Sequence, residues 1–269
     1  MDDSLGDWLA LREPHDRTAR SAELVRHVAE ALPSERPLRI VDLGTGRGSN
    51  VRYLSSRLPM PQNWLLLDRD AELLAEIPRA MAGSVDERCH IETRQMDLGT
   101  LDPSVVAGCD LVTASALLDL VSDGWLRSLA GRCRDAGAVG LFALTYNGQS
   151  RCSPAEPEDD MIRELMNQHQ RSNDKGFGRA AGPDAVDAAA RAFSHANFRV
   201  LRAASNWDLP PDAVELQRRL VEGWSEAALE IAPLRSSMIL DWKRRRLAHV
   251  DSGRSRIVVY HEDFAAFPT

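Results

Sequence analysis

Residues 40–50 read IVDLGTGRGSN, in which a short apolar run ends at Asp42 and leads into Gly44, Gly46 and Gly48. Glycine lacks a Cβ atom, so it adopts positive φ readily and lets a ligand approach the main chain. A glycine loop directly after a strand is typical of open α/β sheets, which bind ligands beyond the carboxyl ends of their strands. The stretch therefore predicts an α/β fold with a ligand site after its first strand. A simple tight turn is the alternative.

The rest of the chain alternates between short apolar runs and helical patterns. Strands are expected at Leu38–Leu43, Trp64–Asp68, His90–Met96, Leu111–Ala114, Val139–Thr145, Phe198–Ala203 and Arg254–His261. Helices are expected at Arg17–Leu32, Asn50–Leu58, Ala71–Ile77, Trp125–Ala136, Asp159–Gln170, Pro183–Ala196, Pro211–Ile231 and Leu234–His249. This alternation predicts βαβ crossovers and a mostly parallel sheet with helices on both faces.

The regular alternation ends after Thr145. Two helical insertions, at residues 146–182 and 209–250, interrupt the C-terminal part of the chain. We expect them to fold over one end of the sheet, so that residues 1–269 form a single domain.

Composition excludes several classes of partner. The formal net charge of −7 predicts neither a nucleic-acid partner nor attraction to an anionic membrane. The run Arg244–Arg246 is expected to be a solvated helix face. The four cysteines lack the spacing of a zinc site, so no metal is expected. Since neither a signal peptide nor an apolar run of about 18 residues is present, we expect a cytoplasmic protein.

Three features restrict the class of ligand that the glycine loop could bind. Ser49 stands where the dinucleotide pattern GxGxxG needs glycine, which disfavours an NAD-dependent oxidoreductase. Asp42 suits a cationic amine better than a pyrophosphate. Asp68 follows an apolar run 22 residues after Gly46, where an acid can accept hydrogen bonds from a ribose diol.

These residues resemble a known family. VDLGTGRG (41–48) followed by LLLDRD (65–70) resembles the first two motifs of the class I S-adenosylmethionine-dependent methyltransferases, and QMDL (95–98) and DLVTASALLDLV (110–121) extend the resemblance. It covers roughly residues 38–145. It implies a Rossmann-like, seven-stranded, mostly parallel sheet with a final antiparallel strand, helices on both faces and helical insertions that form a cap.

The resemblance implies S-adenosylmethionine as cofactor, S-adenosylhomocysteine as its product, and a residue set for each half of the ligand. Asp42 would hold the amino group. The residues at the methionine part and the sulfonium would be Gly44, Thr45, Gly46, Ala114 and Ser115. Those at the nucleoside would be Asp68 on the ribose, Arg69, Met96 and Leu98 beside the adenine, and Asp97 on its amino group. A helix cap or turn is the alternative for Asp97.

The segment before this core has a role in similar enzymes. Residues 1–36 would form a helical flap over residues 38–145, the cofactor-binding core. His15 and Arg20 could then reach the cofactor carboxylate or the substrate. A helix-capping segment is the alternative.

Candidates for the methyl acceptor's site follow the later strands. Asp119 and Tyr146 are candidate catalytic residues, and Asn147 could orient a substrate. Ordinary helix-terminal or turn roles are the alternatives. His169 (also a catalytic candidate), Arg171, Lys175 and Arg179 gather within eleven residues and could bind an anionic acceptor. A solvated loop is the alternative here.

The predicted function is methyl transfer to a small metabolite, with an anionic acceptor favoured by the basic segment. O- or carboxyl-methylation is placed ahead of N- or C-methylation. The rivals are a cofactor-binding regulatory or scaffold protein without chemistry and an NAD-dependent oxidoreductase. The expected partner is a small-molecule substrate, and the chain is expected to be a monomer or homodimer.

Overall fold

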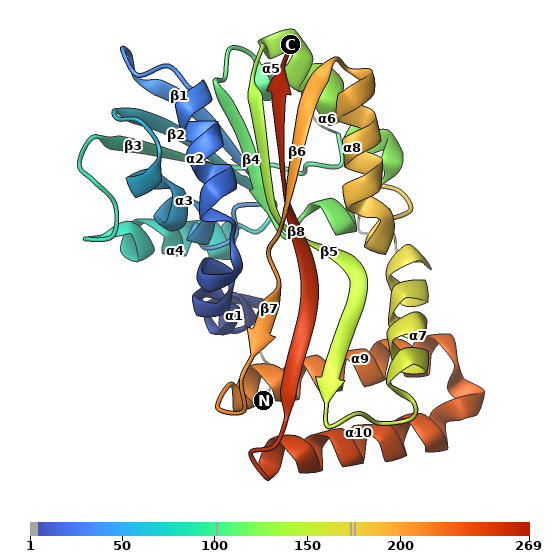
Figure 1. Ribbon diagram of the computed structural model, residues 1–269. Helices are drawn as coiled ribbons and strands as arrows, with labels where there is room; N and C mark the ends of the chain where they lie inside the picture. Colours follow the sequence, from blue (N-terminus) through green and yellow to red (C-terminus); the bar gives the residue numbers. More distant parts are fainter. Residues whose placement is uncertain (1–4, 101, 173, 175) are drawn as a thin grey trace.

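One eight-stranded sheet runs through the protein (Figure 1). The computed structural model describes residues 5–100, 102–172, 174 and 176–269. The strands are β1 (Leu38–Leu43), β2 (Gln62–Asp68), β3 (Cys89–Gln95), β4 (Leu111–Ser115), β5 (Val139–Ser153), β6 (Phe198–Ala204), β7 (Trp207–Leu209) and β8 (Arg256–Pro268). The helices are α1 (Leu5–Ala19), α2 (Ala22–Ala31), α3 (Ser49–Leu54), α4 (Ala71–Met81), α5 (Pro103–Val106), α6 (Asp123–Ala136), α7 (Asp159–Ser172), α8 (Ala185–His195), α9 (Val214–Ile231) and α10 (Ser236–Asp251).

The strand order is β3-β2-β1-β4-β5-β8-β6, and β7 pairs with β8 outside this path. The first five strands of the path are parallel, whereas β8 is antiparallel to β5, β6 and β7. The predicted seven-stranded path with an antiparallel final strand is confirmed. The eighth strand, β7, was not predicted because it is only three residues long. Strand order reverses beside β1, so the carboxyl ends of β1 and β4 flank an open crevice.

Helices cover both faces of the sheet, as predicted. On one face Val28, Leu54 and Ile77 from α2, α3 and α4 pack in one apolar core. On the other face Leu126 of α6 and Phe193 of α8 pack in a second core. The central strands are buried on both sides, which is why they read as continuous apolar runs.

Two strands continue far past the predicted limits. The expected strand ended at Thr145, but β5 runs to Ser153 through a bulge between Tyr146 and Ser150. Asn147 and Gly148 there look like a turn in the sequence, yet they belong to the bulge. The residues expected to open the first insertion are therefore partly strand. The final strand, expected at Arg254–His261, continues to Pro268.

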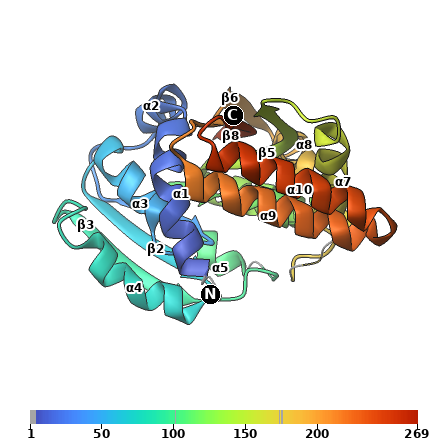
Figure 2. The same cartoon turned by 90° about the horizontal axis from the view of Figure 1, so that it is seen from below.

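The extended halves of β5 and β8 carry a third core with β7, α7, α9 and α10. The last two helices, α9 and α10, lie side by side when the molecule is seen from below (Figure 2). The insertions thus form helices where the sequence predicted them.

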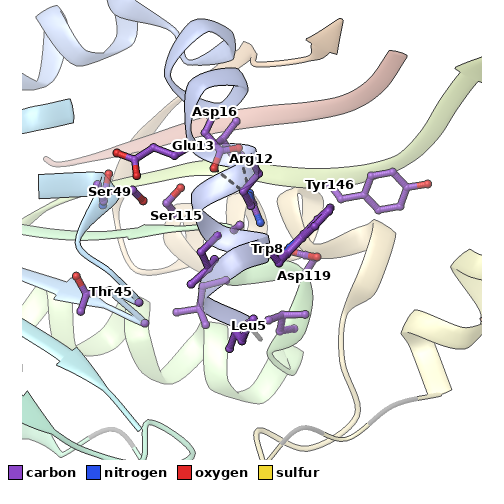
Figure 3. A pocket seen from close by; sticks show the side chains of 18 of the residues that line it. Leu5, Trp8, Arg12, Glu13, Asp16, Thr45, Ser49, Ser115, Asp119 and Tyr146 are labelled. Atoms are coloured by element: carbon purple, nitrogen blue, oxygen red, sulfur yellow. Dashed lines mark hydrogen bonds and ion pairs between the residues drawn. The ribbon is translucent and has the colours of Figure 1, made fainter. Parts of the chain in front are cut away.

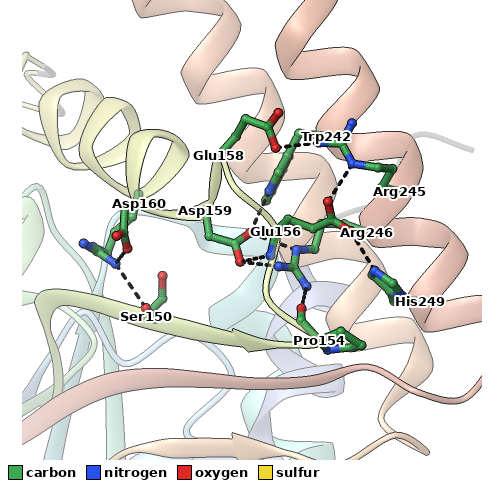
Figure 4. A network of polar contacts seen from close by, with 11 residues as sticks. Ser150, Pro154, Glu156, Glu158, Asp159, Asp160, Trp242, Arg245, Arg246 and His249 are labelled. Carbon is green, nitrogen blue, oxygen red and sulfur yellow. Dashed lines mark hydrogen bonds and ion pairs between the residues drawn. The ribbon is translucent and has the colours of Figure 1, made fainter.

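A buried ion pair holds α10 in place (Figure 4). Arg246 is fully buried; it pairs with Asp159 and donates to the Pro154 carbonyl at 2.5 Å. Trp242 Nε1 donates to the same Asp159 at 2.8 Å. The expectation of a solvated face is therefore wrong for Arg246, although Arg244 beside it is exposed.

The N-terminal segment forms two helices where one, Arg17–Leu32, was expected. Ser21 ends the continuity because its Oγ accepts from Leu24 N at 3.1 Å and caps α2. Its own N–H donates to Asp263 Oδ2 at 2.9 Å. The other oxygen of Asp263 accepts from Leu144 N at 2.9 Å, so this buried acid joins the start of α2 to β5. In the described residues, no helix has the length and apolar character needed to cross a membrane.

Candidate functional site

A cavity of about 480 Å³ lies at the carboxyl ends of β1, β2 and β4 and beside the middle of β5, under α1 (Figure 3). Its volume falls in the range of small-molecule sites, ~300–1,000 Å³. Thr45 and Ser49 lie toward one end, and Trp8, Asp119 and Tyr146 lie toward the other. The cavity thus extends from the glycine loop to the third core. We call this part of the molecule, built from the ends of β5 and β8 with β7, α7, α9 and α10, the helical extension.

The glycine loop forms one wall. Gly44 and Gly46 have φ of +64° and +54°, which a residue with a Cβ rarely adopts. A Cβ on Gly46 would also come within 3.0 Å of Leu9 on α1. Gly46 N donates to Asp68 Oδ2 at 2.7 Å, so the loop is held against the end of β2. Both a tight turn and the close approach of a ligand need glycine at these positions, so the loop geometry fits both interpretations.

A buried polar cluster lies beneath the loop. Asn50 Nδ2 donates to Asp42 Oδ1 at 2.6 Å and to Thr113 Oγ1 at 2.9 Å. Arg20 Nη1 donates to Asn50 Oδ1 at 2.6 Å. Burial raises the pKa of Asp42 to about 6, although the neighbouring side chains of Thr45 and Asn50 and the charge of Arg20 lower it. The Asn50 amide therefore bridges Arg20 and Asp42, with its oxygen toward the guanidinium and its nitrogen toward the carboxylate.

Several atoms of this cluster are buried without hydrogen-bond partners among the described residues. They are Arg20 Nε and Nη2, Asp42 Oδ2 and Thr45 Oγ1. Arg20 also stacks on Tyr53 at 4.2 Å and lines a small cavity that shares Ser49, Ser115 and Leu144 with the large one. Burial lowers the pKa of Arg20, against the attraction of nearby acids. Unsatisfied buried donors and acceptors are uncommon, so this set suits a ligand that carries both a carboxylate and an ammonium group.

The predicted nucleoside residues only partly gather at the cavity. Asp68, Arg69, Met96 and Leu98 line it. Asp97 does not, because its Oδ1 accepts from Gly99 N at 2.9 Å in a local turn. The turn that the sequence left open as an alternative is what the structure shows for Asp97.

Helix α1 covers the cavity and supplies residues that sequence reasoning missed. Trp8, Arg12, Glu13 and Asp16 line the cavity, and His15 does not. Glu13 is held by Arg52 at 2.5 Å. The spacing of Leu5, Trp8, Leu9 and Arg12 was the available signal, since it places these side chains on one helix face.

The far end of the cavity is aromatic. Trp207 packs against Trp8 with ring centroids 6.4 Å apart and against His261 at 5.0 Å. Tyr146 lies 6.1 Å from the ring of His261, on the neighbouring strand. The Tyr146 hydroxyl donates to Asn167 Oδ1 at 3.1 Å, away from Trp8, and burial raises its pKa. Trp207 and His261 come from strands whose full extent the sequence did not show.

Three of the basic residues predicted to clamp an acceptor, His169, Arg171 and Arg179, do not line this cavity. His169 Nε2 contacts Glu230 at 2.9 Å, and Arg171 pairs with Asp184 at 2.9 Å. Arg171 and Arg179 line a separate groove between α6 and α8. Lys175 lies outside the described residues.

Some of the remaining predicted residues line the cavity and others do not. Ser115 and Asp119 line the cavity. Ala114 packs in the core instead, and Asn147 Oδ1 accepts from Gln149 N at 3.3 Å. No group of three or more His, Cys, Asp or Glu side chains in the described residues could hold a metal ion.

Comparison with known proteins identifies the fold. No family model matches the sequence, and neither does any curated protein. Among solved structures, the cyclopropane synthase MmaA2 from Mycobacterium tuberculosis is 10% identical, with a TM-score of 0.50 over 91% of this chain and 82% of that one. The YcgJ protein from Bacillus subtilis is 16% identical, with a TM-score of 0.50 over 92% and 98%. Phosphoethanolamine N-methyltransferase 2 from Haemonchus contortus, in complex with S-adenosylhomocysteine, is 14% identical, with a TM-score of 0.48 over 99% and 59%. With the strand order and glycine loop described above, the likenesses to MmaA2 and YcgJ show that the chain has the class I S-adenosylmethionine-dependent methyltransferase fold.

Proposed function

We propose that this protein binds S-adenosylmethionine and transfers its methyl group to a small molecule in the same cavity. The observation that carries the proposal is Arg20, a buried arginine near the glycine loop whose Nε and Nη2 have no hydrogen-bond partner among the described residues. Its charge needs an anion, and the amino-acid part of the cofactor brings a carboxylate.

The other groups around the loop support the same ligand. Asp42 would face the ammonium group, and Gly44 to Gly46 would lie under the methionine part. Asp68 would accept from the ribose hydroxyls, and Met96 and Leu98 would flank the adenine. When bound, the cofactor supplies an electrophilic methyl group on a sulfonium. The protein then has to orient the acceptor and exclude water, which α1 is placed to do.

Two rivals are separable by experiment. An NAD-dependent oxidoreductase is disfavoured because Asp42 lies under the loop and Ser49 starts α3 where glycine is needed. A scaffold protein that binds the cofactor without chemistry would keep every contact named above. Calorimetry with S-adenosylhomocysteine and NAD tests the first rival, and transfer of a labelled methyl group to a metabolite extract tests the second.

The sharpest binding test uses Arg20 and a matched control. Arg20 and Arg57 both stack on Tyr53 at 4.2 Å, but Arg57 is exposed and donates to the Tyr53 carbonyl. We expect Arg20→Met to weaken S-adenosylhomocysteine binding by about 1.5–3 kcal/mol, the value of a hydrogen bond to a charged group, and Arg57→Met to leave it unchanged.

A second ligand makes this test specific. Methylthioadenosine has the nucleoside and sulfur but no carboxylate, so Arg20→Met should not change its affinity. If both ligands lose affinity equally in this variant, Arg20 does not hold the carboxylate. If NAD binds and S-adenosylhomocysteine does not, the proposed function is wrong.

A further inference from the structure

Helices α6 and α8 lie side by side (Figure 1), and the groove between them is separate from the main cavity. Its volume is about 580 Å³, within the range of small-molecule sites, ~300–1,000 Å³. We call it the basic groove and define it by its guanidinium and carboxylate side chains: Asp123, Arg127, Arg171, Arg179, Asp184 and Arg191. We propose that the basic groove binds a small molecule that carries a phosphate group, and that its occupation favours cofactor binding in the main cavity.

Short side chains leave room inside the groove. Ala180, Ala188 and Ala192 line it and are themselves buried. Ala188, Arg191 and Ala192 fall on one face of α8, because residues three and four positions apart lie together on a helix. The groove thus combines small buried residues with long, charged side chains from several elements.

The positive charge of the groove is only partly balanced. Arg127 pairs with Asp123, and Arg171 pairs with Asp184 at 2.9 Å. Four arginines against two acids leave an excess of two positive charges among the described lining residues, in a chain whose formal net charge is −7. The groove therefore carries a charge opposite in sign to that of the whole chain, and it attracts anions.

Arg179 and Arg191 are the arginines available to a ligand. Arg179 Nε donates to the Arg171 carbonyl at 3.0 Å, and its two Nη atoms have no partner among the described residues. Arg191 makes no hydrogen bond or ion pair with any residue that the structure describes, and both arginines are exposed. A guanidinium group stays charged and presents its N–H donors in one plane, which matches the oxygens of a carboxylate or a phosphate.

A phosphate monoester suits this pair of arginines better than a single carboxylate does. It carries a charge of about −1.5 to −2 at neutral pH and three acceptor oxygens, so it can accept from two guanidinium groups at once. Its larger charge also outweighs the repulsion from Asp123 and Asp184 in the same groove. A ligand with one negative charge gains less from both effects.

One short segment connects the basic groove with the main cavity. Phe177 lines the cavity, and Arg179, two residues later, lines the groove. Phe177 packs edge-on against Trp125 with ring centroids 5.8 Å apart, and Trp125 Nε1 donates to the Leu98 carbonyl at 2.7 Å. Leu98 lines the cavity at the place proposed for the adenine.

The other end of this segment is also held in place. Ala181 N donates to the Val121 carbonyl at 2.7 Å, which joins it to the chain between β4 and α6. An anion that bridges Arg179 and Arg191 would tie the segment to α8 and hold Phe177 at the cavity. Cofactor and anion should then each favour the binding of the other. This coupling rests on the proposed function, whereas the groove itself does not.

Two matched probes test the ligand class. Glycerol 3-phosphate and glycerate share a three-carbon hydroxylated skeleton and differ in the anionic group. The protein is first loaded with S-adenosylhomocysteine, so that Arg20 in the main cavity is not available to either probe. By ligand-observed NMR, we expect glycerol 3-phosphate to bind at least about ten-fold more tightly than glycerate, because it makes more charge-assisted hydrogen bonds.

A variant with a matched control tests the residues. Arg191→Met removes the guanidinium group and should weaken glycerol 3-phosphate binding at least about ten-fold. Arg235, between α9 and α10, is likewise exposed and makes no side-chain contact with the described residues, but it does not line the groove. Arg235→Met should therefore leave the affinity unchanged. Since both side chains are exposed, we expect both variants to fold.

The coupling is tested by calorimetry with S-adenosylhomocysteine in the presence and absence of glycerol 3-phosphate. We expect saturation of the groove to tighten S-adenosylhomocysteine binding about five-fold in the wild-type protein and to have no effect in Arg191→Met. An unchanged affinity in the wild-type protein, with the groove filled, would overturn the coupling.

The remaining outcomes separate the parts of the proposal. Equal binding of glycerate, or failure of glycerol 3-phosphate to bind, overturns the phosphate class. Tighter binding of a phosphoserine peptide than of glycerol 3-phosphate overturns the small-molecule class. Equal losses in Arg191→Met and Arg235→Met would show diffuse attraction to surface charge and overturn the site. If S-adenosylhomocysteine itself fails to bind, the proposed function is wrong, and the two variants without it still test the groove.

Discussion

Asp42 makes no ion pair with the described residues, and its burial contributes to the pH dependence of stability. Its pKa is raised by burial to about 6, from 3.8, so the folded protein binds this proton more tightly than the unfolded chain does. The stabilisation that comes from protonated Asp42 is therefore fully present below pH 3.8 and is lost as pH rises through about 6. An amide in its place cannot ionise and still accepts from Asn50.

We therefore expect Asp42→Asn to gain stability relative to the wild type as pH rises from about 4 to about 7. The gain is at most about 3 kcal/mol, the free-energy equivalent of the pKa shift. Urea unfolding of both proteins across this range measures it. A difference in unfolding free energy that does not change with pH would show that Asp42 titrates normally.

Asp68 offers a second test at a single residue. In the proposed site, Asp68→Ala removes an ionised acceptor from the ribose and should weaken S-adenosylhomocysteine binding by about 1–3 kcal/mol. Asp70→Ala is the matched control, since Asp70 accepts from Glu72 N and Leu73 N at the start of α4 and does not line the cavity. It should lower stability without changing affinity, as measured by calorimetry. Equal losses of affinity in both variants would contradict the ribose assignment.

Among the helices, we expect α1 to open independently of its neighbour α2. Asp16 joins it to the extension, because its Oδ1 accepts from Trp207 Nε1 at 2.9 Å while both oxygens hold Arg12. Asp16→Ala leaves a buried indole N–H and a guanidinium without this acceptor. We expect amide hydrogen exchange in α1 to accelerate by the equivalent of about 1–3 kcal/mol, with α2 unchanged. Asp16→Asn keeps one acceptor and should show a smaller effect; acceleration of both helices alike would mean that α1 does not open separately.

Among the helices and strands, the sequence predicts those with long apolar runs best. The buried parallel strands, their order of appearance and the glycine loop follow from apolar runs and local spacing, so they were predicted well, as were Gly46, Asp68 and Met96 at the cavity. Trp207 was missed because β7 is too short for a pattern. His261 lay within the expected strand Arg254–His261, but the sequence does not show that it pairs with Tyr146 beside the cavity. Arg171 and Arg179 looked like an anion clamp for the acceptor because sequence proximity does not show that both side chains line a separate groove.

Across the whole molecule, β5 and β8 join the parallel part of the sheet to the helical extension. Because both strands pass through both regions, we expect a single cooperative unfolding transition. Arg246→Met should lower the midpoint of that one transition, at a cost of about 3–5 kcal/mol, because it leaves Asp159 without its buried partner. Arg244→Met, in the same helix but exposed and paired with Asp241, should change stability by less than about 0.5 kcal/mol. Two separate calorimetric transitions would show that the extension is an independent unit.

The place of β8 in the sheet also has a consequence for how the chain is made. β8 is synthesised after β6, yet it lies between β5 and β6. While the ribosome is still making the chain, β6 has no neighbour to pair with, and β5 presents a bare edge. The five parallel strands can assemble early, but the aromatic end of the cavity cannot close until β8 has emerged and filled the gap. Nascent chains should therefore bind the nucleoside before they can enclose an acceptor.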